Sequence, residues 1–160
     1  MVGLSFGVFG QNSAEYLENQ IKLSKQDTQK VQYYNQLATL HFKNSPTKAR
    51  KYAEQALNLA KKASYKKGIS EAYYNLGVTY RIQTQHTKAL SFLMKAYQRY
   101  EEANLLSPQA QLLSEIGLVY RQQNDLPHAQ SYFQQSLDIA KKLKQTSQIA
   151  LAYNNLGIRK

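Results

Sequence analysis

The sequence contains no cysteine and no tryptophan among its 160 residues. Without cysteine, disulfide frameworks, thiolate metal sites and cysteine nucleophiles are excluded. No run of eighteen apolar residues occurs, so no segment is expected to span a membrane as a helix. Phosphate loops, dinucleotide fingerprints and zinc-protease motifs are also missing, and none of His41, His86 and His128 has a carboxylate four residues away. These absences predict a chain that is not an enzyme by itself and that uses no metal or cofactor.

Positive charge is concentrated in one segment of the chain. The formal net charge is +11, and nine Lys or Arg residues against one glutamate give residues 30–69 a charge of +8. A surface that binds nucleic acid would continue as an unbroken basic track with exposed aromatic residues. Here Glu101 and Glu102 stand between the lysine pairs at 61–62 and 141–142. We interpret the lysines as a solvated helix face and expect no nucleic acid partner; an anionic membrane surface is the alternative.

One phrase returns on a fixed period. YNLGVTYR begins at Tyr74, SEIGLVYR at Ser114, and a shortened YNNLGIRK at Tyr153. The glycines of the phrase lie forty residues apart, and so do three alanines outside it: Gly77, Gly117 and Gly157, then Ala49, Ala89 and Ala129. Self-similarity at 20–50 residues is typical of solenoid proteins.

Each repeat carries two helical stripes. Ala72, Leu76 and Tyr80 lie on one face of a helix with 3.6 residues per turn, and Ala89, Leu93 and Ala96 form a second stripe after the polar break TQHT. A glycine inside a helix costs about 1 kcal/mol relative to alanine, so we expect the repeated glycines to permit close helix packing opposite Ala89 and Ala129.

The pattern therefore predicts an all-α, right-handed superhelical solenoid of antiparallel helix pairs with a 40-residue period. We divide it into a leader at 1–10, an N-terminal packing helix at 11–29 and a repeat domain at 30–160. The expected repeats are 30–69, 70–109, 110–149 and a partial repeat at 150–160.

The repeat unit resembles the tetratricopeptide repeat (TPR) family. The family pattern is an aromatic residue followed by Leu-Gly, Tyr, Ala, a large apolar residue and a second Ala. In the second repeat these positions are Tyr73, Leu76, Gly77, Tyr80, Ala89, Leu93 and Ala96. The period of forty departs from the family's usual thirty-four, and no polar capping helix follows Gly157. The resemblance implies a non-catalytic module that binds proteins or peptides, from a longer protein.

A narrower resemblance concerns the start of the chain. The apolar MVGLSFGVFG, followed by a short helix and then by NSPTKARKYAEQALNLAKKASYKKGISEAYYNLGVTYR, is similar to the N-terminal sensory region of Bacteroidetes signalling proteins. Those proteins join exported TPR arrays to a histidine kinase or a transcriptional regulator, which implies a periplasmic location and a role in signal transduction. A cytoplasmic scaffold or adaptor, and self-association through the uncapped end after Leu156, are the alternatives.

The predicted peptide-binding groove consists of polar and apolar residues that lie off the packing stripe of the first helix in each pair. These are Asn35, Thr39, Phe42, Tyr74, Asn75, Val78, Arg81, Ser114, Glu115, Leu118, Arg121 and Asn155. Arg81 and Arg121 occupy equivalent places and could hold the carboxylates of an acidic or C-terminal peptide through bidentate hydrogen bonds. Asn75 and Asn155 could bond a peptide backbone, because an amide both donates and accepts.

Overall fold

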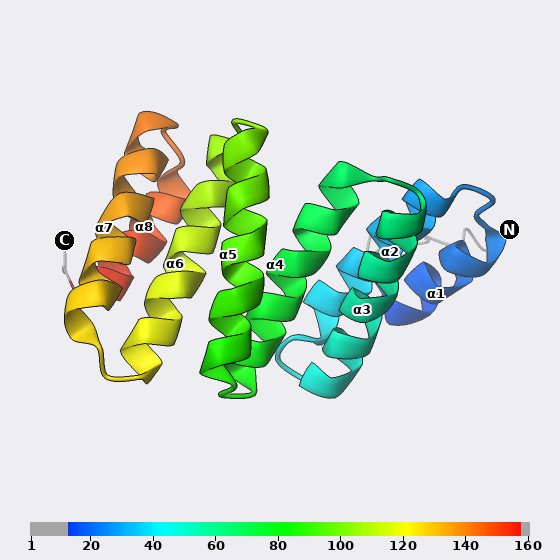
Figure 1. Cartoon of the computed structure of the whole chain (residues 1–160), viewed down its shortest axis with the longest axis horizontal. Coiled ribbons are helices and arrows are strands. Elements are labelled where there is room, and N and C mark those ends of the chain that lie inside the picture. The colour runs from blue at the N-terminus through cyan, green and yellow to red at the C-terminus, as the bar shows by residue number, and fades with distance from the viewer. Residues whose placement is uncertain (1–12, 158–160) are drawn as a thin grey trace, which may run out of the picture. The chain divides into compact units, whose positions relative to one another are not determined.

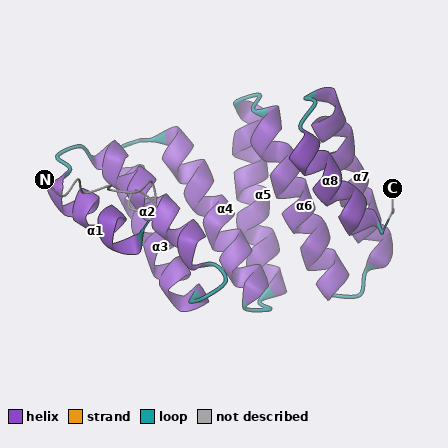
Figure 2. Cartoon of the chain, turned by 180° about the vertical axis from the view of Figure 1, so that it is seen from behind, coloured by secondary structure: helices purple, strands orange, loops and turns teal. Residues whose placement is uncertain are grey.

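The computed structural model describes residues 13–157, and every regular element in that range is an α-helix. The helices, in chain order and as labelled in Figure 1, are α1 (Ala14–Leu23), α2 (Asp27–His41), α3 (Pro46–Lys62), α4 (Lys66–Ile82), α5 (His86–Glu102), α6 (Leu106–Gln122), α7 (Leu126–Lys142) and α8 (Thr146–Leu156). Short turns join them, as Figure 2 shows. The prediction of an all-α helical repeat is confirmed. The leader predicted at 1–10 lies outside the described residues.

Two compact units make up the chain, and the boundary between them falls inside α4. The first ends at Asn75 and the second begins at Leu76. The N-terminal unit holds α1, α2, α3 and the first half of α4. The C-terminal unit holds the rest of α4 together with α5 to α8.

The core of the N-terminal unit is built on small side chains. α1 packs on α2, and α2 packs on α3. The inward stripe of α3 is mostly alanine and follows the helical period: Ala49, Ala53, Ala56, Leu57 and Ala60. Because alanine keeps helix axes close together, α2 meets this stripe with the fully buried side chains of Val31 and Leu37.

The C-terminal unit is built around α6, which contacts α5, α7 and α8. With neighbours on several sides, α6 buries far more than one stripe, and its buried side chains include Leu112, Leu113, Ile116 and Val119. Phe133 of α7 is the largest fully buried side chain of the described residues. The first and second helices of a pair are therefore not equivalent: one is central and the other covers it.

Two repeated glycines permit close packing, but their neighbours differ from those expected. A Cβ added to Gly77 would lie 2.6 Å from Leu93 Cγ, and one added to Gly117 would lie 2.6 Å from Phe133 Cε1. These neighbours lie one helical turn beyond Ala89 and Ala129, which we had expected opposite the glycines. Gly157 has another role, since it ends α8 with a positive φ of 72°.

The five turns that follow α3, α4, α5, α6 and α7 share one backbone conformation. Five residues exactly twenty positions apart have φ between 51° and 61°: Ser64, Thr84, Asn104, Asn124 and Lys144. At Thr84, for example, the N–H donates to the carbonyl of Arg81, and the next N–H, of Gln85, donates to the carbonyl of Tyr80, both at 2.9 Å. This is a Schellman turn, in which the left-handed position is usually glycine. The same turn therefore connects helices within a pair and between pairs.

Thr84→Gly is expected to raise the free energy of unfolding by about 1 kcal/mol. A β-branched residue is strained at positive φ, whereas glycine is not. Urea denaturation followed by circular dichroism measures the change. Ser91→Gly, on the exposed face of α5, is the matched control and should lower stability, because glycine is a poor helix former. Equal losses in both variants would show that Thr84 is not strained.

The sequence signals helix starts at Ser45–Pro46 and Ser107–Pro108, where proline would take the first helical position, and at Asn124–Asp125. The structure agrees with these signals only in part. Pro46 opens α3 as expected, and the side chain of Asp125 accepts a hydrogen bond from the N–H of His128 at the start of α7. Pro108, however, lies inside the first turn of α6, which begins at Leu106. The N-terminal packing helix was expected within residues 11–29, but α1 ends at Leu23. There the extended Ser24 bonds through its hydroxyl to the carbonyl of Gln26.

Candidate binding site

Part of the predicted groove forms a buried polar network in the N-terminal unit. Asn75 Nδ2 donates to Asn35 Oδ1 at 3.0 Å and to the carbonyl of Asn35 at 3.2 Å, so α4 is tied to α2. The hydroxyl of Thr39 lies 3.4 Å from Asn75 Oδ1, and Asn35 Nδ2 lies 3.4 Å from the carbonyl of Gly68. The asparagine side chains are buried. The sequence led us to expect amides that face outward. Instead, these amides join consecutive repeats.

A buried ion pair performs the same linking role in the C-terminal unit. Arg81 Nε of α4 lies 2.7 Å from Glu115 Oε2 of α6, and the two side chains are only 15% and 16% exposed. Burial raises the pKa of the Glu115 carboxyl above its ordinary value, and the Arg81 guanidinium opposes that rise. The cost of removing the Glu115 carboxylate from water thus exceeds its attraction to Arg81, which is common for buried ion pairs. Sequence reasoning placed both residues in the groove but did not recognise that each is the other's partner.

Two more of the predicted residues are in the core. Ser114 is buried, and its hydroxyl lies 2.8 Å from that of Ser136 on α7, whose own hydroxyl reaches the carbonyl of Ala110 at 2.6 Å. Val78 is 3% exposed. These side chains hold helices together in the free protein.

Six of the twelve predicted residues, including Thr39 at the edge of the polar network, are accessible in whole or in part: Thr39, Phe42, Tyr74, Leu118, Arg121 and Asn155. Arg121 is the most distinctive of them, because it is an exposed cation at the end of a central helix. Its guanidinium carbon lies 5.6 Å from the centroid of the Phe133 ring. The binding role of all twelve residues stays a prediction.

Arg81 and Arg121 are equivalent in sequence but differ in their surroundings. Arg81 meets Glu115, thirty-four residues later. The same step from Arg121 leads to Asn155 on α8, which contacts α6. Asn155 Nδ2 is buried and donates to no acceptor of the described residues. The equivalent of Glu115 is therefore an asparagine, and no carboxylate of the described residues pairs with Arg121.

No helix of residues 13–157 is long and apolar enough to cross a membrane. The same residues contain no group of three or more His, Cys, Asp or Glu side chains that could hold a metal ion.

Comparison with known proteins agrees with the repeat pattern. Residues 14–102 and 109–143 each match the tetratricopeptide repeat family. The chain belongs to the tetratricopeptide repeat family, whose repeats are typically non-catalytic modules for protein interaction. The first match begins with α1, so the family pattern starts before the repeat that we placed at residue 30. A search of curated proteins gave no match.

Two solved structures share the fold. Aspartyl phosphate phosphatase F from Bacillus subtilis is 17% identical with a TM-score of 0.75, over 87% of this chain and 38% of that protein. BtubC (BKLC) from P. vanneervenii is 15% identical with a TM-score of 0.71, over 94% of this chain and 68% of that one. The chain thus spans well under half of the phosphatase. At these identities the likeness concerns the fold alone.

Proposed function

We propose that this chain is a non-catalytic protein- or peptide-binding module that serves as the partner-sensing region of a larger, exported bacterial signalling protein. Membership of the tetratricopeptide repeat family supports the interaction role. The resemblance of the N-terminal half to Bacteroidetes sensory regions supports the signalling role. A cytoplasmic scaffold is the alternative. The parent gene distinguishes them: a membrane-spanning segment and a kinase or DNA-binding region beside this segment are expected for a sensor.

The observation that carries the binding proposal is the difference between the two equivalent arginines. The chain itself shows what this position accepts, because Arg81 holds the Glu115 carboxylate at 2.7 Å. Arg121 is exposed, and Asn155 offers an amide in place of the glutamate. A carboxylate from a partner would therefore find the donors at Arg121 that Glu115 finds at Arg81. Guanidinium groups bind carboxylates with the fork geometry that gives both strength and direction.

The partner we expect is an acidic peptide segment or a C-terminal carboxylate. The experiment is selection from a random peptide library displayed on phage, against the wild-type chain, followed by affinity measurement with synthetic peptides. Selected sequences should be rich in Asp and Glu. Arg121→Gln should weaken their binding about tenfold or more, since a hydrogen bond to a charged group contributes roughly 1.5–3 kcal/mol.

Lys142→Gln is the matched control, because it removes one exposed cation at the end of α7 and should leave peptide affinity within about twofold. Arg81 is unsuitable for this test, since its replacement would disturb the buried pair with Glu115. Selected peptides without acidic residues, or peptides indifferent to Arg121→Gln, would contradict the acidic-peptide proposal while leaving peptide binding itself intact. A library that yields no binder would contradict the peptide-binding function.

A further inference from the structure

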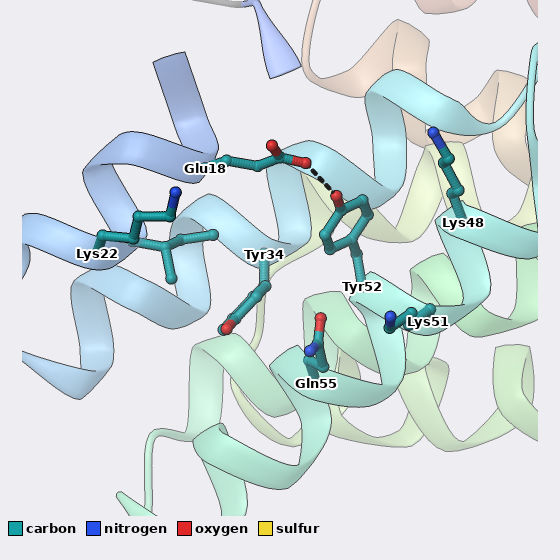
Figure 3. A pocket seen from close by; sticks show the side chains of 8 residues that line it. Glu18, Lys22, Tyr34, Lys48, Lys51, Tyr52 and Gln55 are labelled. Carbon is teal, nitrogen blue, oxygen red and sulfur yellow. Dashed lines mark hydrogen bonds between the residues drawn. The ribbon is translucent and has the colours of Figure 1, made fainter. Parts of the chain in front are cut away.

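A pocket of about 380 Å³ lies in the N-terminal unit among α1, α2 and α3. Figure 3 shows it between Glu18 and Lys22 on α1 and Tyr52 and Lys51 on α3, with Tyr34 of α2 between the two helices. Its volume lies within the range of small-molecule sites in proteins. None of the twelve predicted groove residues lines this pocket, so it is separate from the peptide-binding proposal.

The walls of the pocket carry an excess of positive charge. Lys22, Lys48 and Lys51 line it, against a single carboxylate, that of Glu18. No carboxylate of residues 13–157 pairs with any of the three ammonium groups. Glu18 instead accepts a hydrogen bond of 2.5 Å from the hydroxyl of Tyr52 across the pocket. Three lysines from two helices around one cavity form a local field that favours an anion.

Aromatic rings provide a flat apolar surface beside these charges. The rings of Tyr34 and Tyr52 are stacked with centroids 6.4 Å apart and an angle of 30° between their planes. The ring of Tyr52 also stacks on that of His41 with centroids 5.6 Å apart, which restrains its orientation. Ile21 adds an aliphatic contact from α1. A planar ring packs well against such a surface, because aromatic pairs prefer offset stacking at these distances.

One polar atom in the lining has no partner. Gln55 Oε1 is buried and accepts no hydrogen bond from a described residue. A buried acceptor without a donor lowers the stability of the free protein, and its amide could be replaced by an apolar side chain of similar size. A ligand that brings an N–H or O–H group would satisfy it.

We infer that this pocket binds a small aromatic anion of nucleotide size: a planar ring with an N–H donor, joined to a phosphate or carboxylate. The anionic group would lie among Lys22, Lys48 and Lys51, the ring against Tyr34, and the donor at Gln55. The Glu18 carboxylate would compete with a ligand oxygen for the hydrogen bond that the Tyr52 hydroxyl donates. Burial and the contact with Glu18 raise the pKa of Tyr52 to about 12. The single hydroxyl proton, which Glu18 accepts in the free protein, could be donated to a ligand oxygen instead.

Isothermal titration calorimetry of the full chain with four probes tests the inference. AMP carries ring, donor and phosphate; adenosine lacks the phosphate, ribose 5-phosphate lacks the ring, and p-aminobenzoate replaces phosphate with carboxylate on a smaller ring. At least one of AMP and p-aminobenzoate should bind. If AMP binds, its affinity should be about tenfold or more higher than that of adenosine or of ribose 5-phosphate. Equal binding of AMP and ribose 5-phosphate would show an adventitious anion site only and would overturn the inference. So would the failure of both AMP and p-aminobenzoate to bind.

Two pairs of variants locate the site. Lys48→Gln with Lys51→Gln should weaken binding of the preferred probe by about tenfold or more. Lys62→Gln with Lys66→Gln removes the same charge from exposed positions outside the pocket and should change affinity by less than about twofold. Equal effects of the two pairs would place the binding elsewhere on the basic surface and would overturn the inference.

Gln55→Met provides a readout that charge alone would not change. The free protein should melt at a higher temperature, because the unsatisfied acceptor is removed. Affinity for the preferred probe should fall by about fivefold. If affinity is unchanged while stability rises, Gln55 does not recognise the ligand donor and that part of the assignment is overturned.

Discussion

Arg81→Met is expected to lower the free energy of unfolding by about 3 kcal/mol at pH 7, because it leaves the Glu115 carboxylate buried without its counter-ion. Urea denaturation followed by circular dichroism measures the loss. Arg50→Met is the matched control, since the Arg50–Glu54 pair spans 3.8 Å with side chains 36% and 52% exposed. Exposed pairs contribute little, so the control should lose less than about 1 kcal/mol.

The double variant Arg81→Met with Glu115→Leu should recover most of that loss. Replacing a buried ion pair by apolar residues of similar size is often neutral or stabilising, because no charge has to be desolvated. The raised pKa of Glu115 already indicates that desolvation is the larger effect at this site. A double variant as unstable as Arg81→Met would show instead that the pair contributes specific geometry that methionine and leucine cannot replace.

The cost of Arg81→Met also depends on pH. A carboxyl whose pKa is raised by folding binds its proton more tightly in the folded state than in the unfolded state. Protonation on acidification therefore favours the fold, and this contribution is lost as the pH rises through the raised pKa. Without Arg81 the pKa of Glu115 should rise further. The loss of stability should shrink as the pH falls from 7 toward about 4.5, the ordinary glutamate value. A pH-independent loss would exclude the charge of Glu115 as its cause.

Phe133→Ala and Gly117→Ala are expected to be strongly non-additive. Phe133 is 1% exposed, so its truncation should cost about 3–5 kcal/mol. Gly117→Ala should cost about 1–2 kcal/mol, because the new Cβ would lie 2.6 Å from the Phe133 ring and the overpacking exceeds the gain in helix propensity.

The double variant tests whether the glycine exists to accommodate the ring. In a chain that already carries Phe133→Ala, the methyl of Gly117→Ala meets no ring, and the substitution should stabilise by about 1 kcal/mol. The sign of its effect therefore reverses. Chemical denaturation of all four proteins completes the cycle. If Gly117→Ala is destabilising in both backgrounds, the glycine is required by the backbone and not by Phe133.

The sequence predicts the periodic part of this molecule well. Glycine and alanine at a fixed spacing revealed the helix pairs, because close packing restricts side-chain size at a few positions. The neighbours of those glycines were missed by one helical turn, since a period shows which face is buried but not which residue lies opposite. Leu93 and Phe133 were recognised as apolar but not as the partners of Gly77 and Gly117.

Polar positions were predicted less well, for a physical reason. Asn35, Asn75 and Ser114 have the composition of an exposed face, yet each hydrogen-bonds to a neighbouring helix. A row of apolar residues at helical spacing does not show how much of the helix surface is buried, because that fraction depends on the number of neighbouring helices. α6 packs against α5, α7 and α8, is joined to α4 by the Arg81–Glu115 pair, and buries polar residues with apolar ones. Arg121 was identified as a candidate, and the structure shows it exposed.

The five left-handed turns, twenty residues apart, have a consequence for how such a chain can change in length. Since the same backbone turn joins helices within a pair and between pairs, recombination between any two turns forty residues apart would rejoin helices through a connection of the same kind. Duplication or loss of a pair then requires no new loop. The α1–α2 connection, with its extended Ser24, and the α2–α3 connection, where Phe42 keeps a right-handed conformation, depart from this rule and would not serve as such junctions.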